Sequence, residues 1–442
     1  MLSSDVENIP FGPAGSAATA RRLASTAAIL GRSAASEVRC ARGRDRSVVA
    51  ATALRRAFEE LGPTYVKLAQ LVASSPGLFP DVLAEEFRGC LDAVGPVPSD
   101  VVRAVVAEEL GAPVEEVFAT FDDEPLASAS IAQVHAASLH DGTEVVVKVQ
   151  RPGLAPRLRA DLAILRRAAK VLDRLSRTGR MANPVAVVDD FATTLAAELD
   201  FLTEARSMER FGRTLTERPG ARAARVPWVV WDRTTARVLT MERIHGFKID
   251  DLVALQATGW DLTDALKSAV RAWLESALVH GFFHGDVHAG NLMLDGEGTV
   301  VFLDFGICGE LTDATRRVIC EGLPALLVDR DFKRVATAVY DLGAILSPTD
   351  LDQASKDIAE LVSPILDRPL SEISYGEVLV DIVRVGTRYD VRLPRELVLV
   401  AKQLLYFERY AKLIAPDWAI LDDPELLAFL FEAAIADRGP ER

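Results

Sequence analysis

Several features that mark common protein classes are scarce or absent in this sequence. Only four cysteines occur among 442 residues, and no two of them have Cys-x-x-Cys spacing. They fit unpaired thiols in a reducing compartment. Acidic residues outnumber basic residues by 64 to 50, which gives a net charge of −14. Because binding to nucleic acid needs a basic surface, no nucleic acid is expected as a partner.

Long uncharged apolar runs are also lacking. The stretch 397–414 is apolar but contains Lys402, Glu408, Arg409 and Lys412, so it predicts an amphipathic helix and not a bilayer span. The first twenty residues hold no continuous apolar core, so no secretory signal is expected. We therefore expect a cytoplasmic location, with at most a peripheral contact to a membrane.

The N-terminal segment is rich in arginine, alanine and serine and poor in acids between residues 17 and 47. The favoured interpretation is a flexible basic arm over residues 1–50. Two alternatives stay open: an amphipathic helix on an anionic membrane surface, and a mitochondrial transit peptide. The candidate membrane contacts are Arg21, Arg22, Arg32, Arg39, Arg42, Arg44 and Arg46.

Two motifs of phosphate chemistry lie close together in the C-terminal half. HGDVHAGN at residues 284–291 precedes LDFG at residues 303–306. This order and spacing are typical of a kinase catalytic loop followed by a metal-binding segment. Asp286 is suited to orient or deprotonate the attacking oxygen, while Asn291 and Asp304 offer oxygen ligands to Mg²⁺ on the nucleotide phosphates. Either motif alone would be weak, but the pair favours phosphoryl transfer.

Lys148 lies within a buried β-run at residues 144–149. A buried ammonium needs an anionic partner, so Lys148 is the candidate to hold the nucleotide phosphates and to pair with a helical glutamate. A lysine on an edge strand facing water is the alternative. The glutamate is expected from a helix over residues 187–213, where Glu198 and Glu204 would project from different faces. A solvated acidic face is the alternative there.

The segment before this lysine should cover the phosphates. It reads PLASASIAQVH over residues 125–135 and contains no glycine. Small side chains still allow close approach to phosphate, although alanine lacks the access of glycine to positive φ. The expected loop residues are Ala127, Ser128, Ala129 and Ser130, with the two hydroxyls as donors.

Near the second motif, Cys308 could be a reactive thiol, but a packing role is favoured.

The predicted secondary structure changes along the chain and divides it into three parts. Residues 51–120 predict a helical extension, residues 121–245 a small sheet with helices, and residues 246–442 mostly helices. We therefore expect an α+β, bilobal protein-kinase-like fold, with a small β-containing N-lobe, a mostly helical C-lobe and a helical N-terminal extension. Strands are expected at residues 131–138, 144–150, 226–231 and 238–241.

Taken together, these motifs resemble the UbiB family of atypical protein-kinase-like proteins over residues 54–422. The family signature of lysine, any residue, glycine and glutamine is similar to KLAQ, Lys67 to Gln70, in the extension. The alanine-rich loop, Lys148, the acidic motif ELD at residues 198–200 with Glu204, and the two C-terminal motifs follow in the family order. Three departures are Ala69 for glycine, Ser128 for alanine and Ala289 for proline.

The resemblance implies an ATP-binding kinase or ATPase that acts in isoprenoid quinone or lipid metabolism. It implies ATP or ADP and Mg²⁺ as cofactors, and an isoprenoid or lipid-like substrate. It also implies that the extension folds over the active site, where Lys67 would meet acids such as Glu198 or Asp304. The sequence alone would make Lys67 an exposed helix residue.

Two other functions remain open at this point. Antibiotic-type phosphotransferases of small molecules also carry HGD…N catalytic loops, but the segment from Lys67 to Gln70 and the alanine-rich loop speak against that class. A pseudokinase that senses nucleotide without turnover is the second alternative. The complete set of catalytic carboxylates weighs against it, whereas the glycine-free loop keeps it in consideration.

Overall fold

The structure of the chain is a computed structural model. It describes residues 16–40, 45–73, 80–89, 95–175, 184–216, 224–327, 329–341, 351–366, 395–418, 423 and 426. The chain forms two compact units: Met1–Thr203 with Val229–Arg243, and Glu204–Trp228 with Ile244–Arg442. The chain passes from the first unit to the second near the start of α10 (Phe201–Thr216).

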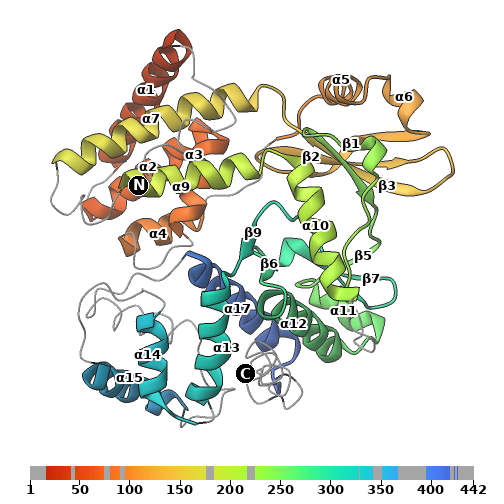
Figure 1. Cartoon of the computed structure of the whole chain (residues 1–442). Helices are drawn as coiled ribbons and strands as arrows, with labels where there is room; N and C mark the ends of the chain where they lie inside the picture. Colours follow the sequence, from red (N-terminus) through yellow and green to blue (C-terminus); the bar gives the residue numbers. More distant parts are fainter. Residues whose placement is uncertain are drawn as a thin grey trace. The chain divides into compact units, whose positions relative to one another are not determined.

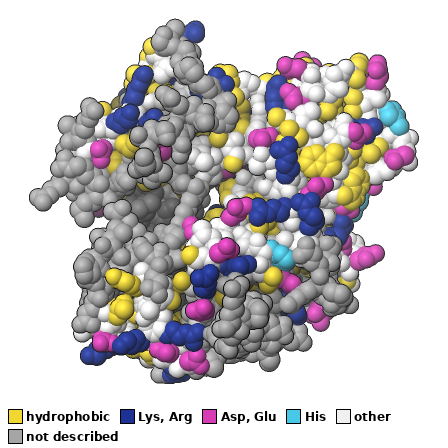
Figure 2. Space-filling model, in the orientation of Figure 1, with side chains coloured by type: hydrophobic (Ala, Val, Ile, Leu, Met, Phe, Trp, Pro, Cys, Tyr) yellow, Lys and Arg dark blue, Asp and Glu magenta, His cyan; other side chains and the backbone are white. Residues whose placement is uncertain are grey.

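Acidic and basic side chains lie intermixed over the described part of the face in Figure 2.

The first unit contains a group of packed helices (Figure 1). They are α1 (Ser16–Cys40), α2 (Arg46–Leu61), α3 (Pro63–Ala73), α4 (Asp81–Phe87), α7 (Leu154–Leu175) and α9 (Pro184–Ala197). Phe58, Tyr65 and Phe87 form the aromatic part of their core. Gly62, at φ +90, lets the chain turn from α2 directly into α3. This group places Lys67 on α3.

Residues 16–40 are not part of a flexible arm as the sequence predicted, because they form helix α1 against α2 and α7. Residues 1–15 and 41–44 of that arm lie outside the described residues. Arg22 donates to both carboxylate oxygens of the fully buried Asp161, at 2.6 and 3.0 Å, and to the carbonyl of Leu61 at 2.7 Å. A buried carboxylate needs such a partner, which the sequence pattern could not reveal. Arg22 is therefore a part-buried residue bound within this group of helices, which disfavours it as a membrane contact, while Arg42 and Arg44 lie outside the described residues.

The sheet of the first unit is antiparallel, with the order β1-β2-β3-β4. Its strands are β1 (Thr120–Ser128), β2 (Ala132–Ser138), β3 (Glu144–Gln150) and β4 (Val238–Glu242). Helices α5 (Ser99–Leu110) and α6 (Val114–Val117) accompany it, and Val106 and Phe118 are buried in one core with Val145 and Val147 of β3. The bounds predicted for β3 agree with the structure. The strand expected at residues 226–231 is wrong, since that segment makes only an isolated bridge at Val229 before the short helix η2 (Trp231–Arg233).

The second unit is mostly helical. Besides the rest of α10, its helices are α11 (Leu252–Thr258), α12 (Leu262–Leu278), α13 (Asp313–Leu327), α14 (Phe332–Asp341), α15 (Leu351–Leu366) and α17 (Arg395–Ile414). Trp273 of α12 is fully buried and packs against Phe407 of α17 at a centroid distance of 5.7 Å. Its Nε1 donates to the carbonyl of His284 at 2.8 Å. This core therefore supports the start of the HGD motif.

Short strands surround the two C-terminal motifs. They are β5 (Gly246–Lys248), β6 (Phe282–His284), β7 (Leu292–Asp295), β8 (Val300–Phe302) and β9 (Cys308–Glu310). They form a three-stranded sheet, β5-β7-β8, and a pair, β6-β9. The loop between β6 and β7 ends in the short helix η3 (Ala289–Asn291). Where the chain is described, no helix is both long and apolar enough to cross a bilayer.

Candidate active site

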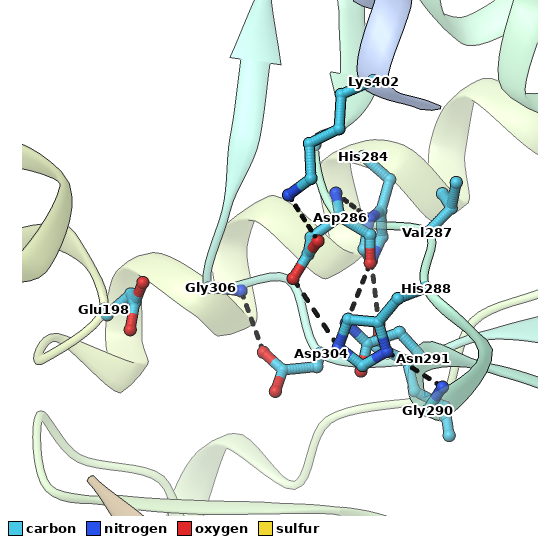
Figure 3. Close-up of polar contacts among 12 residues, drawn as sticks. Glu198, His284, Asp286, Val287, His288, Gly290, Asn291, Asp304, Gly306 and Lys402 are labelled. Carbon is cyan, nitrogen blue, oxygen red and sulfur yellow. Dashed lines mark hydrogen bonds and ion pairs between the residues drawn. The ribbon is translucent and has the colours of Figure 1, made fainter. Parts of the chain in front are cut away.

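The catalytic loop is anchored at its first residue, His284. This side chain is completely buried at the end of β6. Its Nε2 donates to the carbonyl of Leu303 at 2.8 Å. Its Nδ1 accepts from the backbone N–H of Asp286 at 3.1 Å (Figure 3). These two bonds require the neutral imidazole with its proton on Nε2. His284 thus ties the catalytic loop to the residue before Asp304.

Burial lowers the pKa of His284, although its hydrogen bond to Leu303 acts in the opposite direction. Below about pH 6.5, His284 is therefore protonated in the unfolded chain but stays neutral in the folded chain. The free energy of unfolding should fall as the pH drops below this value. We expect His284→Gln to lose less stability than the wild type between pH 7.5 and 5.5. Urea unfolding of both proteins at the two pH values measures this. Equal losses would contradict the assignment of the neutral histidine.

The Asp286 carboxylate lies between two nitrogen groups (Figure 3). Its Oδ1 is 2.9 Å from Nζ of Lys402, on α17, and its Oδ2 is 3.6 Å from Nε2 of His288. His288 is itself fixed, because its Nδ1 accepts from the N–H of Gly290 at 2.9 Å. The side chain of Asp286 is 20% exposed. It is therefore held in place and still open to an attacking hydroxyl or water.

Asn291 and Asp304 present the oxygen atoms suited to a metal. The buried Asn291 uses its amide nitrogen to bind the carbonyl of Asp286 at 2.9 Å, so its Oδ1 is the atom suited to a cation. Asp304 is exposed and has φ +53, in the left-handed region that few residues other than glycine adopt. Next to it, Phe305 is buried against His284 and Phe211, at centroid distances of 4.6 and 5.3 Å.

The donor set fits Mg²⁺ that is shared with a nucleotide. Mg²⁺ prefers hard oxygen ligands and is commonly held by one or two protein groups together with water and phosphate oxygens. Asn291 and Asp304 supply an amide and a carboxylate oxygen of this kind. Among the residues with described positions, no three His, Cys, Asp or Glu side chains gather into a site that could hold a metal by themselves. The residues therefore suit a metal that phosphate helps to bind.

In the first unit, Lys148 is buried on β3, and its Nζ lies 5.2 Å from the ring centroid of Phe201. A cation above an aromatic face is stabilised by the ring quadrupole. Gln150, two residues further along β3, donates to the carbonyl of Leu199 at 2.9 Å. The strand that carries Lys148 is therefore linked to the acidic segment at residues 198–200.

The sequence predicted Glu198 and Glu204 on one helix, but in the structure they do not share a helix. Asp200 accepts from the N–H of Leu202 at 3.1 Å and from the hydroxyl of Thr203 at 2.7 Å, which starts α10 as a separate helix. Glu198 is buried in the break after α9, while Glu204 is buried on α10 and belongs to the second unit.

The signature lysine of the extension has an acidic neighbour. Nζ of Lys67 is 3.3 Å from Oε2 of Glu198, and the two side chains are 21% and 8% exposed. Gln70 is half-buried one turn further along α3. Lys67 is thus not the exposed helix residue that the sequence alone favours, because a buried carboxylate faces it.

The alanine-rich segment is only partly a loop. Ala127 and Ser128 end β1, and the N–H of Ala129 donates to the carbonyl of Ala132 at 2.9 Å in the turn that follows. Arg151, which the sequence analysis did not single out, donates to the Ser128 hydroxyl at 2.7 Å and to the Ala129 carbonyl at 2.8 Å. The hydroxyl of Ser130 is buried and has no hydrogen-bond partner among the residues with described positions.

Cys308 is a packing residue. Burial raises the pKa of its thiol to about 12, which keeps it protonated at neutral pH. Its sulfur lies 3.5 Å from the carbonyl of Phe305, so the side chain contacts the segment at residues 303–306. A reactive thiolate at this position is therefore disfavoured.

Comparison with known proteins shows which family the chain is similar to. Residues 90–339 match the ABC1 atypical kinase-like domain, and residues 358–419 match the UbiB helical domain. The uncharacterized protein Rv0647c of Mycobacterium tuberculosis is 46% identical over 376 residues, which cover 85% of this chain and 77% of that protein. The probable protein kinase UbiB of Marinobacter nauticus is 36% identical over 82% of this chain and 66% of its own length.

A solved structure has a similar fold. It is the complex of Rv3197 with erythromycin from Mycobacterium tuberculosis, with a TM-score of 0.52 and 25% sequence identity over 81% of this chain and 94% of that chain. The matches confirm both the resemblance and the kinase-like fold predicted from the sequence. The chain belongs to the ABC1/UbiB family of atypical kinase-like proteins.

Proposed function

We propose that this protein is an ATP-dependent phosphotransferase or ATPase that uses Mg²⁺. The observation that carries the proposal is the catalytic loop, where Asp286 is partly open, its Oδ1 is bound by Lys402, its Oδ2 lies beside His288, and Asn291 is tied to its carbonyl. Phosphoryl transfer needs mainly positioning and charge stabilisation, which this arrangement can provide. Asp286 orients the attacking oxygen and receives its proton.

The remaining residues bind the nucleotide. Lys148 holds the phosphates, and the hydroxyl of Ser130, which is buried without a partner among the described residues, is a further donor to them. Asn291 and Asp304 bind Mg²⁺, which when bound would neutralise charge on the phosphate oxygens. The Lys67–Glu198 pair supports a regulatory contact of the extension with the acidic segment that follows α9.

The acceptor is proposed from relatives. The chain belongs to the ABC1/UbiB family, and the family resemblance of its motifs implies an isoprenoid or lipid-like acceptor in quinone or lipid metabolism, which we propose is reached from the cytoplasm at a membrane surface. The erythromycin complex of a structural neighbour favours a small-molecule phosphotransferase as the second candidate. ATP hydrolysis measured with an isoprenoid phenol, with a macrolide and with neither compound separates the two candidates.

Nucleotide binding is the first test of the proposal. Mg-ADP should raise the melting temperature, because a ligand at a hundred times its Kd stabilises the folded state by about 2.7 kcal/mol. Lys148→Met should remove most of this increase, whereas Lys170→Met, an exposed position on α7, should retain it. An unchanged melting temperature of the wild type at saturating Mg-ADP would refute the proposal.

A further inference from the structure

Helix α17 holds the backbone of the catalytic loop through two side chains. Gln403 is fully buried, accepts from the N–H of Val287 at 2.9 Å and donates to the carbonyl of Gly285 at 2.7 Å. Tyr410 donates from its hydroxyl to the carbonyl of Val287 at 2.9 Å. The residues on both sides of Asp286 are thus bonded to a helix that lies about a hundred residues further along the chain.

Lys402 precedes Gln403 and reaches the reactive group itself. Its Nζ is 2.9 Å from Oδ1 of Asp286, with the two side chains 27% and 20% exposed, and it lies 5.7 Å from the ring centroid of Tyr406. Partly exposed ion pairs contribute little to folding stability, typically about 0–1 kcal/mol. Stability alone therefore gives little reason for this contact.

An aspartate side chain needs an external partner to fix its carboxylate plane, because its terminal torsion is broad and close to two-fold. Lys402 supplies a partner for Oδ1, while His288 lies beside Oδ2 at 3.6 Å. The carboxylate is thereby oriented with Oδ1 toward Lys402 and Oδ2 toward His288 (Figure 3). Two separately matched domains meet here, since Asp286 lies within residues 90–339 and Lys402 within residues 358–419.

We propose that Lys402 is a positioning residue that holds Asp286 in the orientation needed to bind the attacking oxygen. In this proposal, the C-terminal helical domain completes the catalytic centre of the kinase-like domain. The inference rests on the proposed function, because it assigns a role to Asp286 in turnover. Small errors of position at a reacting group lower rates strongly, by up to about a hundredfold for a displacement of about 1 Å.

The test compares Lys402→Met and Lys402→Arg with Lys412→Met, a control at an exposed lysine on the same helix. Each protein is assayed for kcat and KM in Mg-dependent ATP hydrolysis and for the rise in melting temperature with Mg-ADP. Lys402→Met should lower kcat by at least about tenfold and leave KM for ATP and the Mg-ADP effect unchanged. Lys402→Arg should recover most of kcat, because a guanidinium can also bind the carboxylate. Lys412→Met should behave as the wild type.

Three results would overturn the inference. These are a normal kcat in Lys402→Met, an equal loss in Lys402→Arg, and a loss of kcat in Lys402→Met together with the Mg-ADP effect, which would show a structural role. The wild type serves as the reference for the proposed function. If it neither binds nor hydrolyses nucleotide, the proposed function fails and the inference fails with it. If it is active and Lys402→Met is equally active, only the inference fails.

Discussion

Replacing Asp286 by asparagine should lower the turnover of ATP by at least about a hundredfold, the usual cost of losing a general base. Asparagine has nearly the same shape and can keep the backbone contacts with His284 and Asn291, which involve the N–H and carbonyl of residue 286. It cannot accept a proton from the attacking oxygen, and it offers no charge to Lys402. Because the backbone contacts remain and the proposed metal ligands are unchanged, the rise in melting temperature with Mg-ADP should stay close to that of the wild type.

The control for this substitution is Asp313→Asn, at an aspartate that is 87% exposed at the start of α13. Steady-state ATP hydrolysis and thermal unfolding are measured for the three proteins. If Asp286→Asn retains the wild-type rate, Asp286 is not the catalytic base. If it loses both turnover and nucleotide binding, its role is to maintain the site.

A second large effect is expected for Asp304→Asn. The substitution removes the only negative charge of the proposed metal ligands, Asn291 and Asp304. The stabilisation by ADP with Mg²⁺ should fall to the value seen with ADP and a chelator, and turnover should fall by at least about a hundredfold because the phosphate charge is no longer neutralised.

This substitution is well matched to the backbone. Residue 304 has φ +53, and asparagine is one of the few residues that tolerate this region. The melting temperature without nucleotide should therefore stay near that of the wild type, which separates loss of the metal from loss of the fold. Persistence of the full magnesium-dependent stabilisation would show that the metal binds elsewhere.

The parts of the candidate site that are encoded by a few consecutive residues could be predicted from sequence motifs. The catalytic loop, the metal segment and strand β3 are each set by fewer than about ten consecutive residues, so their types and order were visible in the sequence. The small strands β6 and β9 were not expected, because three residues carry too little periodic signal. Pairing between distant segments forms them.

The errors have a common physical origin in contacts between segments that the residue pattern of each segment does not show. The segment at residues 125–128 lacks the alternation of a strand, and its pairing with β2 decides its structure. Arg22 of helix α1 binds Asp161, which lies 139 residues further along the chain. Lys402 was noted only as a charge that interrupts an apolar stretch, although it lies 116 residues from Asp286 in sequence and binds it. No local pattern encodes such a pair.

The hydrogen bonds of His284 have a mechanical consequence. One imidazole joins the carbonyl of Leu303 to the N–H of Asp286, so the segment that presents the metal ligand and the segment that presents the base are coupled. If the metal segment moved away, the imidazole would lose its bond to Leu303 and keep the bond to the N–H of Asp286, so the direct link between the two segments would be broken. The distance between the base and the metal ligand is therefore set in part by one buried side chain, and a change at His284 should alter both segments.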